Sequence, residues 1–324
     1  MLTGALNTFL PILVTFIIGG ILIASIGQNP LETYWVMVSK SLFSTNGILK
    51  TLHFAAPLIL TGLAIAITFK ANIFNMGVEG QMLFGAFFSG VIGFSFDLPA
   101  PLHIALCLIV GMVSGVLFAL IPAILKSFFK VNEMVVTLML NYVAIELTKY
   151  LAQGPFKDAT SGYVATYTIN ENAMFKKIFD SNITAFFFVA ILAFVLIYIL
   201  MKKSKLGFEI TAIGKNPEFA EASGMKVGKK IIYIMMISGA LSGLAGAGWI
   251  MSEKFRFTAD FSGTPGLGWD GMLIALLGAH NPLGVLIAAI FYAALKTGSE
   301  YVGLYTEVPK DIVGVIQGIL ILLL

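Results

Sequence analysis

The chain has few charged residues and only one cysteine, and each shortage excludes some classes of protein. Asp, Glu, Lys and Arg make up 11% of the 324 residues, against about 25% in an ordinary soluble domain. Hydrophobic residues make up 58%, and the mean hydropathy is +0.93. The single cysteine, Cys107, lies in an apolar run and can form no disulfide within the chain. The composition excludes a soluble domain and indicates a membrane protein.

The short alternating segments of a membrane β-barrel are also missing. Apolar stretches instead run for about 16–22 residues, the length that a helix needs to cross about 30 Å of hydrocarbon. We therefore predict an all-α polytopic membrane protein. No basic residue precedes the first run and no cleavage site follows it, so we expect a retained first helix. Polar, Pro and Gly breaks predict about ten transmembrane segments, near 8–26, 54–70, 82–96, 102–125, 133–152, 184–201, 231–250, 270–279, 283–298 and 311–324.

One phrase occurs twice. Residues 77–83 read Gly-Val-Glu-Gly-Gln-Met-Leu, and residues 268–273 read Gly-Trp-Asp-Gly-Met-Leu, with one residue fewer. The spacing is 268 − 77 = 191 residues. Each copy places an acid, Glu79 or Asp270, between two glycines beside an apolar segment. An uncompensated charge at the centre of a membrane helix costs about 2.5–3.5 kcal/mol on insertion scales, so both placements need an explanation.

The segments that follow the two phrases, 82–96 and 270–279, are short for a membrane span. A short apolar segment next to a Gly break is typical of a half-helix that stops at membrane depth. Matching breaks in two halves of a membrane chain indicate a transport pathway at a repeat interface. The alternative is two glycine-rich turns that resemble each other by chance.

Basic residues are concentrated in one loop. Seven lysines fall between Lys202 and Lys230, and such a loop is typical of the cytoplasmic side. The net charge of +3 therefore implies no nucleic-acid partner. With ten crossings both termini lie inside, and the two phrases enter the membrane from opposite faces. This arrangement predicts an inverted repeat with halves near 54–152 and 231–324 and the cytoplasmic loop 202–230 between them.

The basic loop contains the start and stop signals of a short helix. Asn216 is expected as N-cap, Pro217 as first helical residue, Glu218 in the first turn and Gly224 as the stop. A helix of about seven residues is not stable alone, because isolated helices below about 12–15 residues are marginal in water. It either packs under its own bundle or docks on a cytoplasmic partner, with Phe219 and Ala222 toward a groove of that partner.

Other chemistry finds little support in the sequence. The three histidines lie far apart without ligand spacing, so we expect no metal site. An intramembrane enzyme would need a polar catalytic constellation at membrane depth, and none is recognisable. An ion-coupled secondary transporter would need an ionisable residue deep in a crossing, and Glu146 is the one moderate candidate.

Several runs resemble the permease subunits of ABC importers, in the superfamily that serves branched-chain amino acids, ribose and nucleosides. Sugar permeases of that superfamily have Asp-Leu-Ser-Val-Gly at the first break, where this chain has Asn-Met-Gly-Val-Glu-Gly, so the resemblance favours nucleosides over sugars or branched-chain amino acids. It covers most of the chain, but the outer segment 154–182 has no counterpart that we can use. The runs that carry it are 71–82, 212–220, 268–271 and 275–284.

The resemblance implies a transport subunit of the bacterial plasma membrane that is not itself an enzyme. An extracytoplasmic binding lipoprotein is expected to deliver its substrate. A separate cytoplasmic subunit is expected to bind ATP-Mg and hydrolyse the ATP. The chain has no Gly-x-x-x-x-Gly-Lys-Ser/Thr phosphate loop of its own, and no cofactor is expected in it. A second, related permease subunit is expected in a heterodimer, with a homodimer as the alternative. The implied ATPase-coupling residues are Asn216, Pro217, Glu218, Phe219, Glu221 and Gly224.

Polar and aromatic residues around the two phrases are the candidates for the substrate pathway. Glu79 and Asp270 either contact substrate or cap the half-helices beside them. Amides offer both donor and acceptor to a nucleobase edge, and aromatic rings can stack on a base, unless they pack against lipid or core. Asn141 either bonds a neighbouring helix or lines the path. The full set is Asn72, Phe74, Asn75, Glu79, Gln81, Asn141, Trp269 and Asp270.

Overall fold

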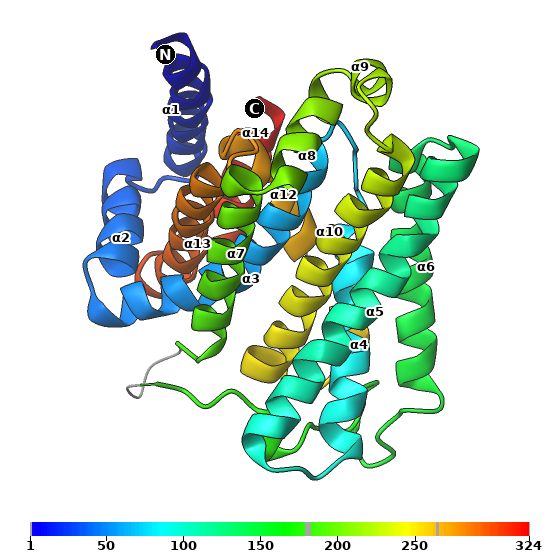
Figure 1. Cartoon of the computed structure of the whole chain (residues 1–324). Coiled ribbons are helices and arrows are strands. Elements are labelled where there is room, and N and C mark those ends of the chain that lie inside the picture. The colour runs from blue at the N-terminus through cyan, green and yellow to red at the C-terminus, as the bar shows by residue number, and fades with distance from the viewer. Residues whose placement is uncertain (1, 179–182, 264–265, 324) are drawn as a thin grey trace. The chain divides into compact units, whose positions relative to one another are not determined.

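The computed structural model describes residues 2–178, 183–263 and 266–323 and is helical almost throughout (Figure 1). No β-strand occurs within those ranges, where isolated β-bridges join Lys157 to Thr166 and Ala165 to Thr258. The helices are α1 (Leu2–Ser25), α2 (Pro30–Leu42), α3 (Thr45–Lys70), α4 (Val78–Ser95), α5 (Ala100–Phe129), α6 (Glu133–Gln153), α7 (Phe186–Lys203), α8 (Lys205–Lys215), α9 (Pro217–Ala222), α10 (Val227–Trp249), α11 (Ala259–Gly263), α12 (Leu267–Leu277), α13 (Pro282–Tyr305) and α14 (Lys310–Leu323), with a 3-10 turn η1 (Glu171–Ala173) and a π-helical turn η2 (Ile250–Lys254).

Six described helices are long and apolar enough to cross a membrane. They are α3, α5, α6, α7, α10 continued through η2, and α13. Residues 10–25 of α1 pass the same test only together with α2, and the two are bent by 119° at the break between them. The all-helical membrane fold is therefore confirmed. The expected total of about ten segments is not reached, because α4, α12 and α14 do not qualify by themselves within the described residues.

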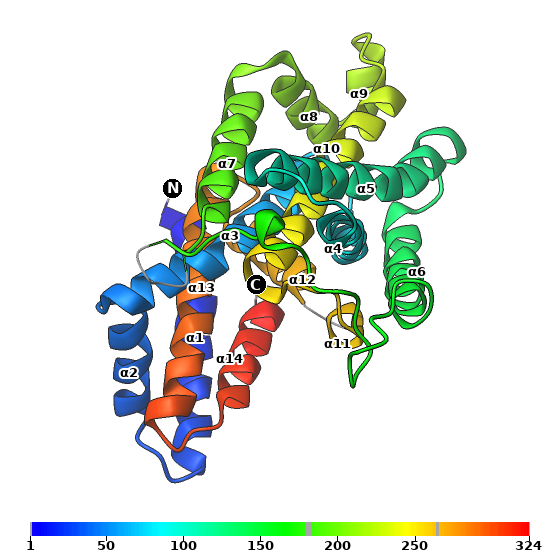
Figure 2. The same cartoon turned by 90° about the horizontal axis from the view of Figure 1, so that it is seen from below.

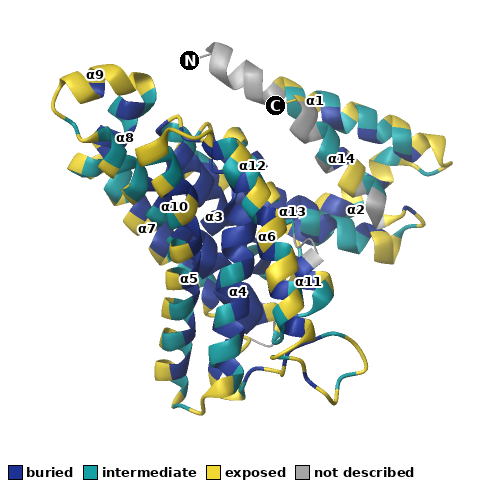
Figure 3. Ribbon diagram, turned by 90° about the vertical axis from the view of Figure 1, so that its right-hand side faces the viewer, coloured by how far each residue is buried: buried dark blue, intermediate teal, exposed yellow. Residues whose placement is uncertain are grey.

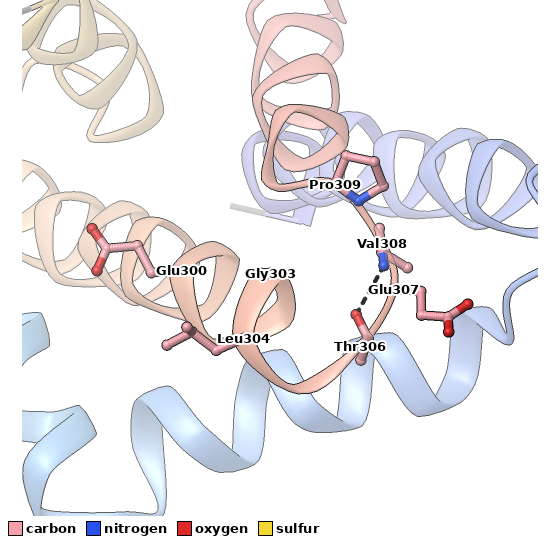
Figure 4. A pocket seen from close by; sticks show the side chains of 7 residues that line it. All are labelled: Glu300, Gly303, Leu304, Thr306, Glu307, Val308 and Pro309. Atoms are coloured by element: carbon pink, nitrogen blue, oxygen red, sulfur yellow. Dashed lines mark hydrogen bonds between the residues drawn. The ribbon is translucent and has the colours of Figure 1, made fainter.

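The chain forms two compact units, and the first contains both chain ends. It consists of residues 1–55, 177–183 and 287–324. Lys50 and Glu300 form an ion pair in it. A pocket of about 580 Å³ lies at the turn between α13 and α14, where the Val308 amide donates to the Thr306 hydroxyl (Figure 4). The apolar core of this unit contains Ile23, Met37, Leu295, Val302, Val308 and Ile316.

The second unit, residues 56–176 and 184–286, is built on α4, α5 and α10. These three helices lie side by side (Figure 2). Small residues allow that approach: a Cβ at Gly243 of α10 would collide with the Gly111 carbonyl of α5, and one at Gly85 of α4 would collide with Gly243. Close packing at small residues is the usual means of helix association in lipid, where burial of apolar surface gives no driving force. The glycine-rich part of α10 therefore fixes the position of α4.

The segment between α6 and α7 covers one end of this second unit. Its backbone amides at Thr166 and Ile169 donate to the carbonyls of Phe257 and Phe255, and the Asn170 amide donates to the Gly93 carbonyl at the end of α4. The hydroxyl and amide of Thr160 donate to Asp158 and hold the pKa of that carboxyl below its usual range. The part of 154–182 that the structure describes is thus anchored to α4 and to the chain beyond α10.

Candidate functional site

The first repeated phrase lies at a true break between α3 and α4. After Lys70 the chain leaves the helix, and Asn72 adopts a left-handed conformation with φ 56°, which Asn tolerates better than most residues. The Asn72 side chain is exposed. Helix resumes at Val78, the second residue of the phrase. An interruption is therefore present, but the helix that the sequence placed at 82–96 begins earlier and contains most of the phrase.

Two buried side-chain amides hold this break in place through hydrogen bonds. Asn75 and Gln81 are 0% and 1% exposed and face each other, each donating to the other's oxygen at 3.2 Å. Asn75 also donates to the Ser238 hydroxyl on α10 at 2.9 Å and accepts from the Gly77 amide at 3.0 Å. Buried polar groups are costly unless they are paired, and here the pairing joins the break to α10. Sequence reasoning missed Ser238, because nothing local marks its distant partner.

Side chains on one face of α6 form hydrogen bonds with backbone groups that have no helical partner because of the break. Asn141, which is 4% exposed, accepts from the Gly80 amide at 2.9 Å and donates to the Met76 carbonyl at 2.8 Å. One turn earlier, the Thr137 hydroxyl accepts from the Met76 amide at 3.1 Å. Of the two alternatives left by the sequence, bonding to a neighbouring segment therefore accounts for both groups of the Asn141 amide.

The same face of α6 begins with a buried acid. Glu133 lies four residues before Thr137, accepts from the Phe74 amide at 3.4 Å and pairs with Lys126 at 2.6 Å. Polar residues four apart fall on one side of a helix. The spacing of Glu133, Thr137 and Asn141 at every fourth residue of α6 is a signal that could have identified Glu133 and Thr137 from the sequence.

Glu79 connects the two repeated phrases. Its side chain is 3% exposed, and its two oxygens accept from the Gly266 amide at 2.9 Å and the Gly268 amide at 2.6 Å. These amides belong to the first turn of α12, whose N-cap is Gly266. Glu79 itself lies in the first turn of α4. One carboxylate therefore caps α12 while it belongs to α4, and it lies at the amino ends of both helices, where a negative charge is favoured.

The two helix ends approach each other closely. A Cβ at Gly268 would lie 2.6 Å from the Glu79 amide nitrogen and 2.7 Å from its Cα, which no side chain could tolerate without a backbone shift. The second phrase therefore needs a glycine where it touches Glu79 of the first, and the two similar phrases are in direct contact in space.

From this meeting point the two helices run to different ends of the second unit. Gly93, near the end of α4, packs against Ile169 in the segment after α6. Gly271 of α12 packs against Thr61 of α3, and the His280 ring beyond α12 lies 5.4 Å from the Phe69 ring near the end of α3. Burial and then the charge of Lys70 lower the pKa of His280. With 11 residues, α12 is about 16 Å long and cannot span about 30 Å of hydrocarbon.

The remaining pathway candidates lie nearer the surface. Phe74 and Trp269 are 37% and 38% exposed, and Asp270 is of intermediate exposure. The Phe74 ring packs edge-on against Phe69 at 5.1 Å. The eight candidates thus form two groups: Asn75, Glu79, Gln81 and Asn141 are buried in a network, whereas Asn72, Phe74, Trp269 and Asp270 are accessible.

The basic loop contains the expected short helix and a second one that the sequence analysis did not separate. In α9, Asn216 caps by accepting from the Phe219 amide at 2.8 Å, Pro217 is first, and Gly224 follows the helix with φ 86°. Phe219 is 70% exposed, whereas Ala220 is buried. Most of α9 is exposed (Figure 3). The preceding α8 packs its Gly214 directly against the backbone at the end of α3, so the loop is more ordered than a polar linker. Glu218 and Glu221 are exposed on α9.

The rival candidate Glu146 lies on the exposed face of α6. It is therefore outside the buried network that holds the two phrases.

Comparison with known proteins gives one family. Residues 47–324 match the family described as "Branched-chain amino acid transport system / permease component". The guanosine ABC transporter permease NupP of Bacillus subtilis is 37% identical over 84% of this chain and 79% of its own length. The nucleoside ABC transporter permease NupB of Lactococcus lactis is 33% identical over 94% of this chain and 86% of its own.

A sugar permease is also similar. The glucose ABC transporter permease TsgB13 of Haloferax volcanii is 33% identical over 97% of this chain and 85% of its own length. No solved structure matches the chain. The family match and these relatives agree with the multi-pass helical fold, and the chain belongs to the permease components of ABC transporters.

Proposed function

We propose that this permease imports nucleosides across a bacterial plasma membrane, driven by ATP hydrolysis in a separate subunit. The observation that carries the proposal is its similarity, at 37% and 33% identity, to permeases named for guanosine and for nucleosides. A second candidate cargo is glucose, because the glucose permease relative aligns with 97% of the chain at 33% identity.

The cargo is tested by transport into vesicles that contain the whole importer with its ATPase and binding lipoprotein. Labelled guanosine, uridine, glucose and leucine are offered one at a time. The proposal is supported if a nucleoside is taken up in an ATP-dependent way and excess glucose does not inhibit that uptake. Uptake of glucose alone would make the protein a sugar permease. Uptake that persists after removal of the ATPase, with an ion gradient present, would instead make the protein a secondary transporter.

Within the site, the accessible group is proposed to contact the solute and the buried group to hold the pathway in shape. Asn72 and Asp270 offer hydrogen-bonding groups, and Phe74 and Trp269 offer rings that can stack on a base. The buried amides have partners within the protein, so contact with a solute would require breaking that network. The opposite courses of α4 and α12 from one meeting point support the proposed inverted repeat, with halves near 54–152 and 231–324.

Helix α9 is proposed to couple the ATPase to the pathway. An exposed Phe219 on a capped helix fits a groove on a cytoplasmic partner, and α8 connects it to the end of α3. Phe219→Ala should abolish co-purification of the ATPase while the permease keeps its thermal stability. The matched control is Phe129→Ala at the end of α5, whose side chain is 69% exposed. Unchanged co-purification in Phe219→Ala would remove α9 from this role.

The assembly is proposed to include a second, related permease and an extracytoplasmic binding lipoprotein. A second guanosine permease of Bacillus subtilis, NupQ, is 29% identical to this chain over 80% of it, so two different permeases of one organism resemble it. This supports a heterodimer. Expression with and without a paralogous permease, followed by size analysis of the purified complex, distinguishes a heterodimer from a homodimer.

A further inference from the structure

A pocket of about 410 Å³ lies where α8, the end of α9 and the start of α10 come together. Four lysines line it, namely Lys205, Lys226, Lys229 and Lys230, together with one acid, Glu209. Glu209 is buried and already pairs with Lys230 at 2.6 Å. Four positive charges less one negative charge leave the lining with an excess of three. The pocket therefore favours an anion.

Two exposed aromatic side chains lie in the same lining. Phe208 is 68% exposed and Tyr233 is 50% exposed. Tyrosine is enriched at the boundary between membrane and water, where lysine ammonium groups also reach the headgroups. Phenylalanine is typical of the apolar face of helices that lie in this boundary. Tyr233 lies six residues into α10, about 9 Å along its axis from the start of a candidate span. The pocket thus combines an anion-binding lining with apolar surface at the expected headgroup level.

We propose that this pocket binds the headgroup of an anionic phospholipid. Lys205, Lys226 and Lys229 hold the phosphate, while Phe208 and Tyr233 contact the glycerol and the first part of the acyl chains. A free phosphate would use the lysines but gain nothing from the two rings. The proposal depends on α7 and α10 being membrane spans and not on which solute is carried.

The site borders the proposed coupling segment. Ser223 and Gly224, directly after α9, are part of the lining. A lipid in the pocket would therefore touch α8, α9 and α10 together and stabilise their arrangement, since a ligand that binds the folded form stabilises it by mass action. Anionic lipid is expected to raise the thermal stability of the permease more than zwitterionic lipid does.

The test uses the full-length permease in detergent and native mass spectrometry with added phosphatidylglycerol or phosphatidylcholine. Phosphatidylglycerol should bind preferentially. Each lysine close to an anionic surface is worth about fivefold in affinity, so Lys226→Gln with Lys229→Gln should weaken binding about 25-fold. The control, Lys130→Gln with Lys215→Gln, removes two exposed lysines outside the pocket and should leave binding unchanged. Phe208→Ser should also weaken lipid binding.

Four results would overturn the proposal. Equal binding of the two lipids would remove the preference for an anion, and equal loss in both double variants would show a general effect of charge. Binding of inorganic phosphate with the affinity of the lipid would assign the pocket to a free anion. Loss of the ATPase from the pocket variant with unchanged lipid binding would make the pocket a protein-docking surface.

Discussion

The two copies of the repeated phrase have similar sequences but different surroundings. In the first, Glu79 is 3% exposed and accepts from the Gly268 amide of the second copy and from the Gly266 amide just before that copy. In the second, Asp270 is partly exposed in the first turn of α12. At the amino end of α4 a backbone amide donates to Asn141 of α6, whereas at the amino end of α12 a backbone amide donates to Glu79. The two similar phrases therefore differ in role. Glu79 holds the junction, meaning the contact between the amino ends of α4 and α12, whereas Asp270 remains accessible.

The largest effect is expected from removing the acid that holds the junction. Glu79→Ala leaves the amides of Gly266 and Gly268 without their acceptor, at about 1–3 kcal/mol for each buried group. Asp270→Ala removes a charge near a helix end and should cost about 0.3–1 kcal/mol. Thermal unfolding of the two purified variants measures the difference. Equal losses of stability would mean that the two acids do not differ in role.

A somewhat smaller loss is expected when the first helix end loses its cap. Asn141→Leu leaves the Gly80 amide and the Met76 carbonyl without their partner and should lower the free energy of unfolding by about 2–4 kcal/mol, because two neutral buried groups are affected. Glu146→Gln on the exposed face of α6 is the control and should change stability by less than about 0.5 kcal/mol. A stable Asn141→Leu protein would mean that α4 does not need α6.

The glycines of the two phrases provide a third contrast. Gly268→Ala places a methyl group 2.6 Å from backbone of Glu79, whereas at Gly77 the nearest atom is a Thr137 side-chain carbon at 3.1 Å. Overpacking of this kind costs about 1–3 kcal/mol, so Gly268→Ala should unfold at a clearly lower temperature than Gly77→Ala. A lower unfolding temperature for Gly77→Ala than for Gly268→Ala would mean that the tight contact is not at Gly268.

The smallest change in stability is expected from the accessible copy. Trp269→Ala should change the free energy of unfolding by less than about 1 kcal/mol and still raise the KM for a nucleoside about fivefold or more, since stacking on a base is worth about 1–3 kcal/mol. Trp35→Ala, an exposed tryptophan in the first unit, serves as control. An unchanged KM in Trp269→Ala would remove this ring from the pathway.

Much of the local structure could be predicted from the sequence. The signals around Asn216, Pro217 and Gly224 predicted α9, because caps and glycine stops depend on neighbouring residues alone. Long apolar runs identified the spans from α5 to α7. The break near Asn72 and the short α12 also followed from local glycines and length.

The partners across the fold could not be predicted. Nothing near Glu79 in the sequence shows that its carboxylate bonds to amides 187 and 189 residues away. Bonding of Asn75 to Ser238 depends on the approach of α10, which small residues permit but do not align. The total of ten crossings was counted from apolar runs, and a run as short as 270–279 can stop within the membrane instead of crossing it. Tertiary packing therefore decides which polar residues hold the junction and which remain accessible.

Amide hydrogen exchange over residues 266–272 tests the junction most directly. In the parent protein the amides of Gly266 and Gly268 should be protected, and Glu79→Ala should speed their exchange about 5- to 150-fold, the equivalent of about 1–3 kcal/mol. Asp270→Ala should leave them protected. Fast exchange at Gly268 in the parent, or exchange that Glu79→Ala leaves unchanged, would contradict a junction held by this carboxylate.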